Sequence, residues 1–155
     1  MRPSAKENDM ASVRKAGRLS ICLVSALALA LTCAVAVYAQ PLTIPQGTHC
    51  AECGMAVDRD SKFSASVIDE KGGKLFFCDI GDMLYHFKKS KAAVQSVNVR
   101  DYASGAWIDG KKAWYVLNKK FVTPMYWSVA AFSTEADAKK WGAAAGFDSA
   151  FGLIK

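Results

Sequence analysis

The residues best able to do chemistry lie in one short segment, His49–Met55, with the sequence HCAECGM. It contains a CxxCG unit formed by Cys50, Cys53 and the glycine that follows. This spacing allows two thiolates to bind one metal ion, and Met55 adds a thioether to the same segment. Thiolate and thioether sulfurs select Cu(I) over hard cations. The segment therefore predicts a soft-metal site, and Cu(I) suits its donors best.

Three other interpretations of the CxxC unit stay open. A closed structural zinc site needs a second pair of ligands, and the chain has no second CxxC. A thiol–disulfide redox site usually opens a helix after a strand, whereas this unit follows a proline-containing segment and precedes an expected strand. A structural disulfide between Cys50 and Cys53 would close a very short loop and would therefore stabilise the fold little.

Further ligands would have to come from outside this segment. Met125 follows a proline in a loop between two expected strands, where it is either a ligand or a core residue. Cys78 ends an apolar strand and is more typical of a buried small hydrophobic residue than of a ligand. His49 borders the CxxCG unit, and His86 lies near the end of an expected helix, where it favours a surface position. Among these candidates, Met125 is the strongest.

The N-terminal segment has the pattern of an export signal. Residues 1–18 are basic, and residues 19–38 form a run of 20 uncharged, mostly apolar positions. Small residues favour cleavage after Ala39, but the run is also long enough to span a bilayer. Cys33 offers a lipidation site, although the residue before it fits a lipoprotein box poorly. All three fates place residues 40–155 in the periplasm or otherwise outside the cytoplasm.

The cysteine count and the charge pattern exclude several classes of protein. Cys22 and Cys33 lie in the N-terminal segment, so three cysteines remain for the exported part. An odd number is a poor disulfide framework. The formal net charge is +6, but the lysines are scattered in pairs without interleaved aromatic residues, so a nucleic-acid surface is not expected. The sequence also lacks a Ser/His/Asp set and a phosphate loop. Asp79 and Asp82 are interpreted as a helix cap and its first-turn neighbour instead of an acid/base pair, and we expect no enzyme.

Hydrophobic periodicity predicts the elements that must position these residues. The first half is expected to contain strands at 62–68 and 74–78, a helix at about 79–89 and a strand at 96–102. The second half is expected to contain strands at 113–117 and 127–132 and a helix that starts after Ser133 and ends at Gly146. This order indicates an α+β fold of two ββα(β)-like units with mostly antiparallel sheets, preceded by an N-terminal signal or anchor helix. The expected divisions are a signal or anchor at 1–39, a linker at 40–47 and a domain at 48–155, with subunits of about 48–104 and 105–155.

Over about residues 48–146 the chain resembles the NosL family of exported, usually lipid-anchored copper-binding proteins. The motifs that carry the resemblance are CAECGMAV at 50–57, FCDIGDMLYHF at 77–87, and TPM at 123–125 followed by VAAF and an alanine-rich helix. The resemblance implies a two-part α+β fold and one Cu(I) bound through Cys and Met, with Cys53 and Met125 as the best ligands, Met55 next and Cys50 after it. It also implies delivery of copper to nitrous oxide reductase. The chain departs from the family in its weak lipidation box and in the aromatic pair that follows Met125.

Overall fold

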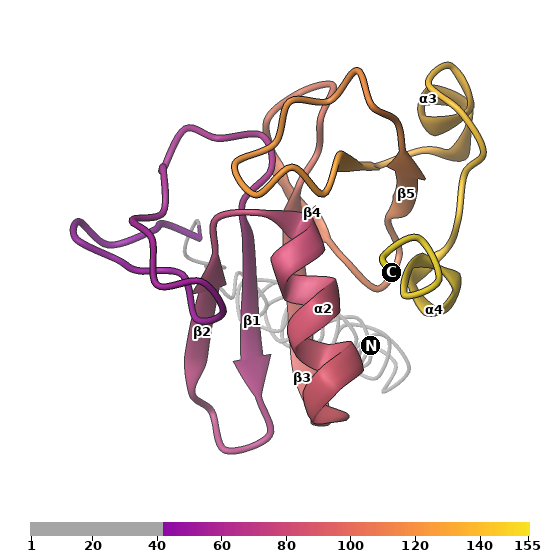
Figure 1. Ribbon diagram of the computed structural model, residues 1–155. Helices are drawn as coiled ribbons and strands as arrows, with labels where there is room; N and C mark the ends of the chain where they lie inside the picture. Colours follow the sequence, from indigo (N-terminus) through magenta and orange to yellow (C-terminus); the bar gives the residue numbers. More distant parts are fainter. Residues whose placement is uncertain (1–41) are drawn as a thin grey trace, which may run out of the picture. The chain divides into compact units, whose positions relative to one another are not determined.

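The computed structural model describes residues 42–155 (Figure 1). The predicted signal or anchor at 1–39, with its cleavage site and Cys33, lies outside the described residues. Within the described range, none of the helices combines the length and the apolar character needed to cross a membrane.

The first half of the domain is an antiparallel sheet covered by one helix (Figure 1). The strand order is β2-β1-β3-β4, with β1 at Ala65–Asp69, β2 at Lys74–Phe77, β3 at Val94–Arg100 and β4 at Trp107–Asp109. The helix α2, Ile80–Ser90, follows β2 directly and contacts both β2 and β6. The sheet and α2 thus place the end of β2 beside the first turn of the helix.

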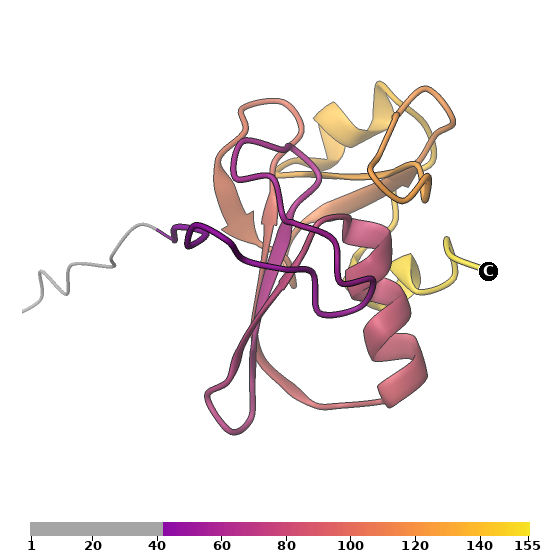
Figure 2. The same ribbon diagram turned by 60° about the vertical axis from the view of Figure 1, so that its left-hand side comes forward.

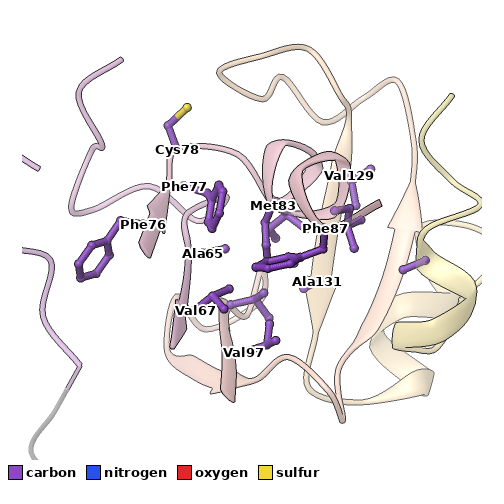
Figure 3. Packing of buried hydrophobic residues seen from close by; sticks show 14 of the residues in the cluster. Ala65, Val67, Phe76, Phe77, Cys78, Met83, Phe87, Val97, Val129 and Ala131 are labelled. Carbon is purple, nitrogen blue, oxygen red and sulfur yellow. The ribbon is translucent and has the colours of Figure 1, made fainter. Parts of the chain in front are cut away.

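The helix forms because its apolar residues recur at helical spacing. Ile80, Met83, Leu84 and Phe87 are buried against the sheet. Asp79 caps the helix, since its side chain accepts a hydrogen bond from the backbone N–H of Gly81 at 2.8 Å. Figure 3 shows this cluster, in which Met83 and Phe87 face the buried valines of the strands.

The second half is a two-stranded antiparallel sheet with two short helices. The strands are β5, Trp114–Leu117, and β6, Val129–Phe132, and the helices are α3, Glu135–Lys139, and α4, Phe147–Ala150. A parallel bridge between Asp101 and Ala131 joins this half to the end of β3. The Asp101 carboxylate also accepts the backbone N–H of Ser133 at 3.0 Å, so one buried side chain links the two halves.

The predicted α+β class with mostly antiparallel sheets is confirmed, and so is the helix that follows the first hairpin. The second predicted helix is wrong in extent. It is capped by Thr134 instead of Ser133 and ends at Lys139. The chain then turns at Gly142, whose φ is 156°, and Ala145 pairs with Tyr115 through two backbone hydrogen bonds of 2.8 Å. A strand-like pairing therefore replaces the helical turns that the alanine-rich composition indicates.

Candidate metal centre

The CxxCG unit forms a tight backbone turn attached to the end of β2. The N–H of Cys50 donates to the carbonyl of Met55 at 2.7 Å, and the N–H of Gly54 donates to the carbonyl of Cys50 at 2.9 Å. Gly54 has φ +76°, which glycine adopts without the strain that a side chain would add. The N–H of Ala51 donates to the carbonyl of Phe76 at 2.8 Å. The turn is thereby held against the strand that leads to Cys78.

A salt-bridged cluster fixes the same turn to α2. Glu52 lies between the two cysteines, and its carboxylate contacts Nδ1 of His86 at 2.8 Å and Nζ of Lys89 at 2.7 Å. The hydrogen bond from Lys89, followed by that from His86, lowers the pKa of Glu52 below its ordinary value, although burial opposes this. Figure 2 shows the segment that precedes β1, drawn in indigo, running past α2, in agreement with these contacts.

The junction between β2 and α2 contributes two further side chains. Cys78 follows the last residue of β2, and Asp82 lies in the first turn of α2. The Sγ of Cys78 is 3.5 Å from Oδ2 of Asp82. In Figure 3 the sulfur of Cys78 points away from the hydrophobic cluster that contains Phe77 and Met83. Although Cys78 is buried, its thiol therefore faces the cysteine turn instead of the core.

Together these two segments assemble a four-residue cluster, Cys50, Cys53, Cys78 and Asp82. One ligand atom from each member lies within 4.8 Å of all the others. The Sγ atoms of Cys53 and Cys78 are 3.4 Å apart, and the Sγ of Cys50 is 3.4 Å from Oδ2 of Asp82. A metal held by thiolates at about 2.3 Å in a tetrahedral site separates its ligands by roughly 3.8 Å. The cluster therefore has the spacing that one metal ion requires.

Burial raises the pKa of two thiols of the cluster and defines the open side of the cluster. Cys50, Cys78 and Asp82 are buried, and only Cys53 is partly exposed. Burial raises the pKa of the Cys53 thiol, an effect that a hydrogen bond from the backbone N–H of Met55 partly offsets. Burial also raises the pKa of the Cys78 thiol strongly, and the neighbouring Cys53 adds to this. Any metal ion bound by these two thiols would have to displace their protons, and Cys53 is the member of the cluster that solvent reaches.

The loop 123–128 of the second half packs against this cluster. The indole Nε1 of Trp127 donates to Oδ1 of Asp82 at 2.7 Å, and its ring stacks on Tyr85 with 5.7 Å between ring centroids. The backbone N–H of Met125 donates to Oδ2 of Asp79 at 3.0 Å. Burial raises the pKa of Asp79, while hydrogen bonds from Thr123 and two backbone N–H groups oppose the rise. Two carboxylates of the helix start thus hold the loop in place.

The backbone of this loop is strained at two positions. Tyr126 and Ser128, on either side of Trp127, have φ of 59° and 58°. The left-handed region is unfavourable for residues with a Cβ atom. The Tyr126 side chain is 82% exposed, so its own packing does not compensate for the strain. The N–H of Tyr126 donates to the carbonyl of Thr123 at 3.0 Å and the N–H of Ser128 donates to the Thr123 hydroxyl at 3.1 Å, and these bonds hold the conformation together with the anchors at the two carboxylates.

The structure brings some of the predicted ligands together and adds others. Cys50 and Cys53 meet in one cluster, as their spacing predicts. Met55 lies on the same turn and is 47% exposed, whereas Met125 is partly buried and is tied to the helix start through its backbone. That any of these four residues binds metal stays a prediction. His49 is exposed, and its backbone pairs with Ala56.

Two members of the cluster have other roles by sequence alone. The sequence pattern favours Cys78 as a core residue and Asp82 as a first-turn neighbour of the helix cap. Cys78 is indeed buried, but its sulfur faces Cys53. The sequence feature that could have indicated their proximity is their spacing of four residues across the junction between β2 and α2, which brings both side chains to the same side of the helix start. The approach of the CxxCG turn, however, depends on the tertiary contact between Ala51 and Phe76.

The fold and the cluster define a small α+β domain with a set of three thiols and one carboxylate that are spaced to hold a metal ion. The sequence model of the NosL family matches residues 41–148, and the chain belongs to this family. The fold is similar to the crystal structure of the copper chaperone NosL from Shewanella denitrificans, with a TM-score of 0.62 and 21% sequence identity over 70% of this chain and 93% of that one. At this identity the likeness is one of fold. Comparison with curated proteins finds no match.

Proposed function

We propose that the protein is an extracytoplasmic Cu(I) chaperone that binds one Cu(I) and passes it to a copper enzyme, with nitrous oxide reductase as the recipient. Membership of the NosL family and the likeness of fold to a copper chaperone support this proposal. The observation that carries it is the convergence of three cysteine sulfurs on one point at the edge of the hydrophobic core. Thiolates in such a set favour a soft ion.

The thiolates of Cys50, Cys53 and Cys78 hold the ion in this proposal. Met55 shares the turn of Cys53, and Met125 is attached to the helix start that carries Asp82. We assign these two methionines as thioether ligands that take over while the ion leaves. One of them comes from each half of the domain, so transfer uses both halves.

Transfer by ligand exchange needs an open coordination side and donors that leave one at a time. The partly exposed Cys53 and the exposed Met55 lie on the open side, whereas Cys50 and Cys78 are buried. A thiol or thioether of the partner joins the ion before Cys53 leaves it. The oxidation state of the ion is unchanged, and no covalent bond of the protein is made or broken. The proposed role is therefore carriage, not catalysis.

The proposed location follows from the N-terminal sequence. An export signal at residues 1–39 places the metal domain outside the cytoplasm. Residues 19–38 or a lipid on Cys33 would hold it at the membrane when the segment is not cleaved. Attachment would keep the domain near membrane-associated partners without any contact from the described residues.

The test is a Cu(I) titration of the full-length protein under anaerobic, reducing conditions against a coloured Cu(I) chelator. We expect one Cu(I) per chain. Cys53→Ser and Cys78→Ser should each weaken binding by more than about tenfold, since removal of even a neighbour of a ligand costs roughly 10- to 100-fold in metal affinity. Met125→Leu should weaken binding or transfer, whereas the matched control Met83→Leu, in the core, should leave both unchanged. Undiminished Cu(I) affinity in Cys53→Ser would reject the site.

A structural zinc site is the second candidate, and Asp82 is the observation that favours it. Three thiolates and one carboxylate are a suitable tetrahedral set for Zn²⁺, and the indole of Trp127 orients the carboxylate at 2.7 Å. Metal analysis after aerobic purification separates the two candidates. Stoichiometric zinc, together with unfolding by a chelator, would support the structural site. A metal-free, folded protein that takes up Cu(I) would support the chaperone.

A further inference from the structure

We propose that Cys53 and Cys78, and not the two cysteines of the CxxC unit, form a reversible disulfide, and that this disulfide and the metal ion exclude each other. The first part stands on the geometry of the thiols alone. The second part rests on the proposed function, because it concerns the ion that the same sulfurs would bind.

The sulfur positions select this pair. The Sγ atoms of Cys53 and Cys78 are 3.4 Å apart. A disulfide bond is about 2.05 Å long, so closure requires the sulfurs to approach by roughly 1.4 Å. All three sulfur pairs of the cluster lie within 4.8 Å, and this pair has the distance and angles of a hydrogen bond. Cys50 contacts Oδ2 of Asp82 at 3.4 Å, and Cys78 contacts the same oxygen at 3.5 Å.

The backbone also holds Cys50 away from this reaction. Its N–H and its carbonyl are both used inside the turn, with Met55 and Gly54 as partners at 2.7 Å and 2.9 Å. Ala51 is bonded to the end of β2. A bond between Cys50 and Cys53 would have to close across this hydrogen-bonded turn. A bond between Cys53 and Cys78 links two segments that are already adjacent, and it closes a much longer loop, which constrains the unfolded chain more.

Exposure gives the two thiols different parts in the exchange. Cys53 is partly exposed, whereas Cys78 is buried with 2% of its surface accessible. The oxidant is a disulfide RSSR, such as oxidised glutathione or a protein disulfide. The Cys53 thiolate attacks one sulfur, which forms a mixed disulfide and releases one RS⁻. The Cys78 thiolate then attacks Sγ of Cys53 and releases the second RS⁻. In total, two protein thiols and one RSSR give one protein disulfide and two RSH.

Oxidation would remove two of the three soft donors from the cluster. Cys50 and Asp82 would remain, and one thiolate with one carboxylate is a poor set for Cu(I). Conversely, an ion bound to Cys53 and Cys78 occupies the sulfurs that would otherwise react. The four-residue cluster would thus bind metal only while Cys53 and Cys78 are reduced thiols. An extracytoplasmic dithiol protein can restore these thiols by the reverse exchange.

The experiment uses the full-length chain in detergent with Cys22→Ser and Cys33→Ser, so that only the three cluster thiols are present. The reduced protein is equilibrated in glutathione buffers of graded oxidation, free thiols are alkylated, and peptide mass spectrometry locates the disulfide. We expect a Cys53–Cys78 bond as the main product. Cys50→Ser should retain it, whereas Cys78→Ser should retain a glutathione adduct on Cys53. Circular dichroism of each variant verifies that it is folded.

Metal competition tests the second part. One equivalent of Cu(I) should protect Cys53 and Cys78 from oxidation, and the oxidised protein should bind Cu(I) more than about 100-fold more weakly than the reduced protein, since it loses two direct ligands. A main product that joins Cys50 and Cys53 would overturn the inference even if the reduced protein binds Cu(I). A Cys53–Cys78 disulfide in a protein that binds no Cu(I) would instead reject the proposed function and leave the redox pair standing. Equal Cu(I) affinity of the two forms would reject mutual exclusion.

Discussion

Gly81→Ala gives a sharp test of how the second half of the domain packs against the cluster of three thiols and Asp82. Gly81 lies in the first turn of α2, where helix propensity alone favours alanine by about 1 kcal/mol. The structure predicts the opposite result. A Cβ atom at this position would overlap both Cβ and Cγ of Trp127. Because the Cβ of Trp127 does not move when its side chain rotates, only a shift of the loop 123–128 can relieve the overlap.

The expected magnitude follows from the contacts that this shift would break. Overpacking of a well-packed contact costs about 1–3 kcal/mol. Displacement of Trp127 also removes its 2.7 Å hydrogen bond to the Asp82 carboxylate, and a hydrogen bond to a charged group contributes about 1.5–3 kcal/mol. After the gain in helix propensity, the free energy of unfolding should fall by about 2–4 kcal/mol. For a small protein this corresponds to a shift of the urea midpoint of about 1–2 M.

Urea unfolding of the full-length protein, followed by circular dichroism, measures this change. Gly146→Ala is the matched control, since its φ is −69° and an added Cβ meets nothing within 4 Å. We expect the control to change the free energy of unfolding by less than about 1 kcal/mol. A midpoint for Gly81→Ala at or above that of the wild type, with unchanged tryptophan fluorescence, would refute the docking that we describe.

Three further predictions concern charge and protonation. Glu52→Gln should lower the free energy of unfolding by less than about 1 kcal/mol. Because the contact with Lys89 lowers the pKa of Glu52 in the folded state, this difference should be full above the ordinary pKa of 4.5 and should decrease as the pH falls below it; a difference in urea titrations that does not decrease below pH 4.5 would contradict this. Because burial raises the pKa of Cys53 and Cys78, Cu(I) binding should release protons and should strengthen as the pH rises from 6 to 9. Calorimetry in buffers of different ionisation enthalpy counts the released protons, and a Cu(I) affinity independent of pH would refute the prediction that these thiols are protonated in the metal-free protein. Asp82→Asn should weaken Zn²⁺ or Co²⁺ binding by roughly 10- to 100-fold but Cu(I) binding much less, since Cu(I) prefers sulfur; equal losses in parallel titrations would place the carboxylate among the Cu(I) ligands.

The predictable part of the fold consists of elements with strong local signals. The helix at 80–90 has apolar residues at regular spacing and an aspartate cap, so periodicity and capping agree. The prediction of a helix up to Gly146 is wrong because alanine content indicates helix propensity and nothing about tertiary contacts. The backbone pairing of Ala145 with Tyr115 is tertiary, and it outweighs that propensity. The strand β4 has three residues, too few for periodicity to indicate.

The sequence predicts only the local part of the candidate site. Cys50 and Cys53 are local to one another, and their spacing alone indicates a shared ion. Cys78 joins them through contacts between segments that lie far apart in sequence, and a buried cysteine that ends a strand has the same sequence pattern whether its sulfur faces the core or a neighbouring thiol. The helix dipole alone favours an acidic residue in the first turn of a helix, so the sequence gives no indication that Asp82 also contacts Trp127.

The two left-handed residues of the loop 123–128 also bear on motion. Each of these residues costs about 1–2 kcal/mol while the loop is docked. Opening of the loop relieves this strain, whereas opening of β1, which contains no left-handed residue, relieves none. The loop should therefore open without global unfolding, and the amides of Met125 and Ser128 should exchange with solvent well before those of Val67 in the central strand. Local openings of this kind take place on microsecond to second timescales. Opening would break the contact of Trp127 with Asp82, so a strained turn in the half of the domain that contributes none of the three thiols would control access to one side of the cluster.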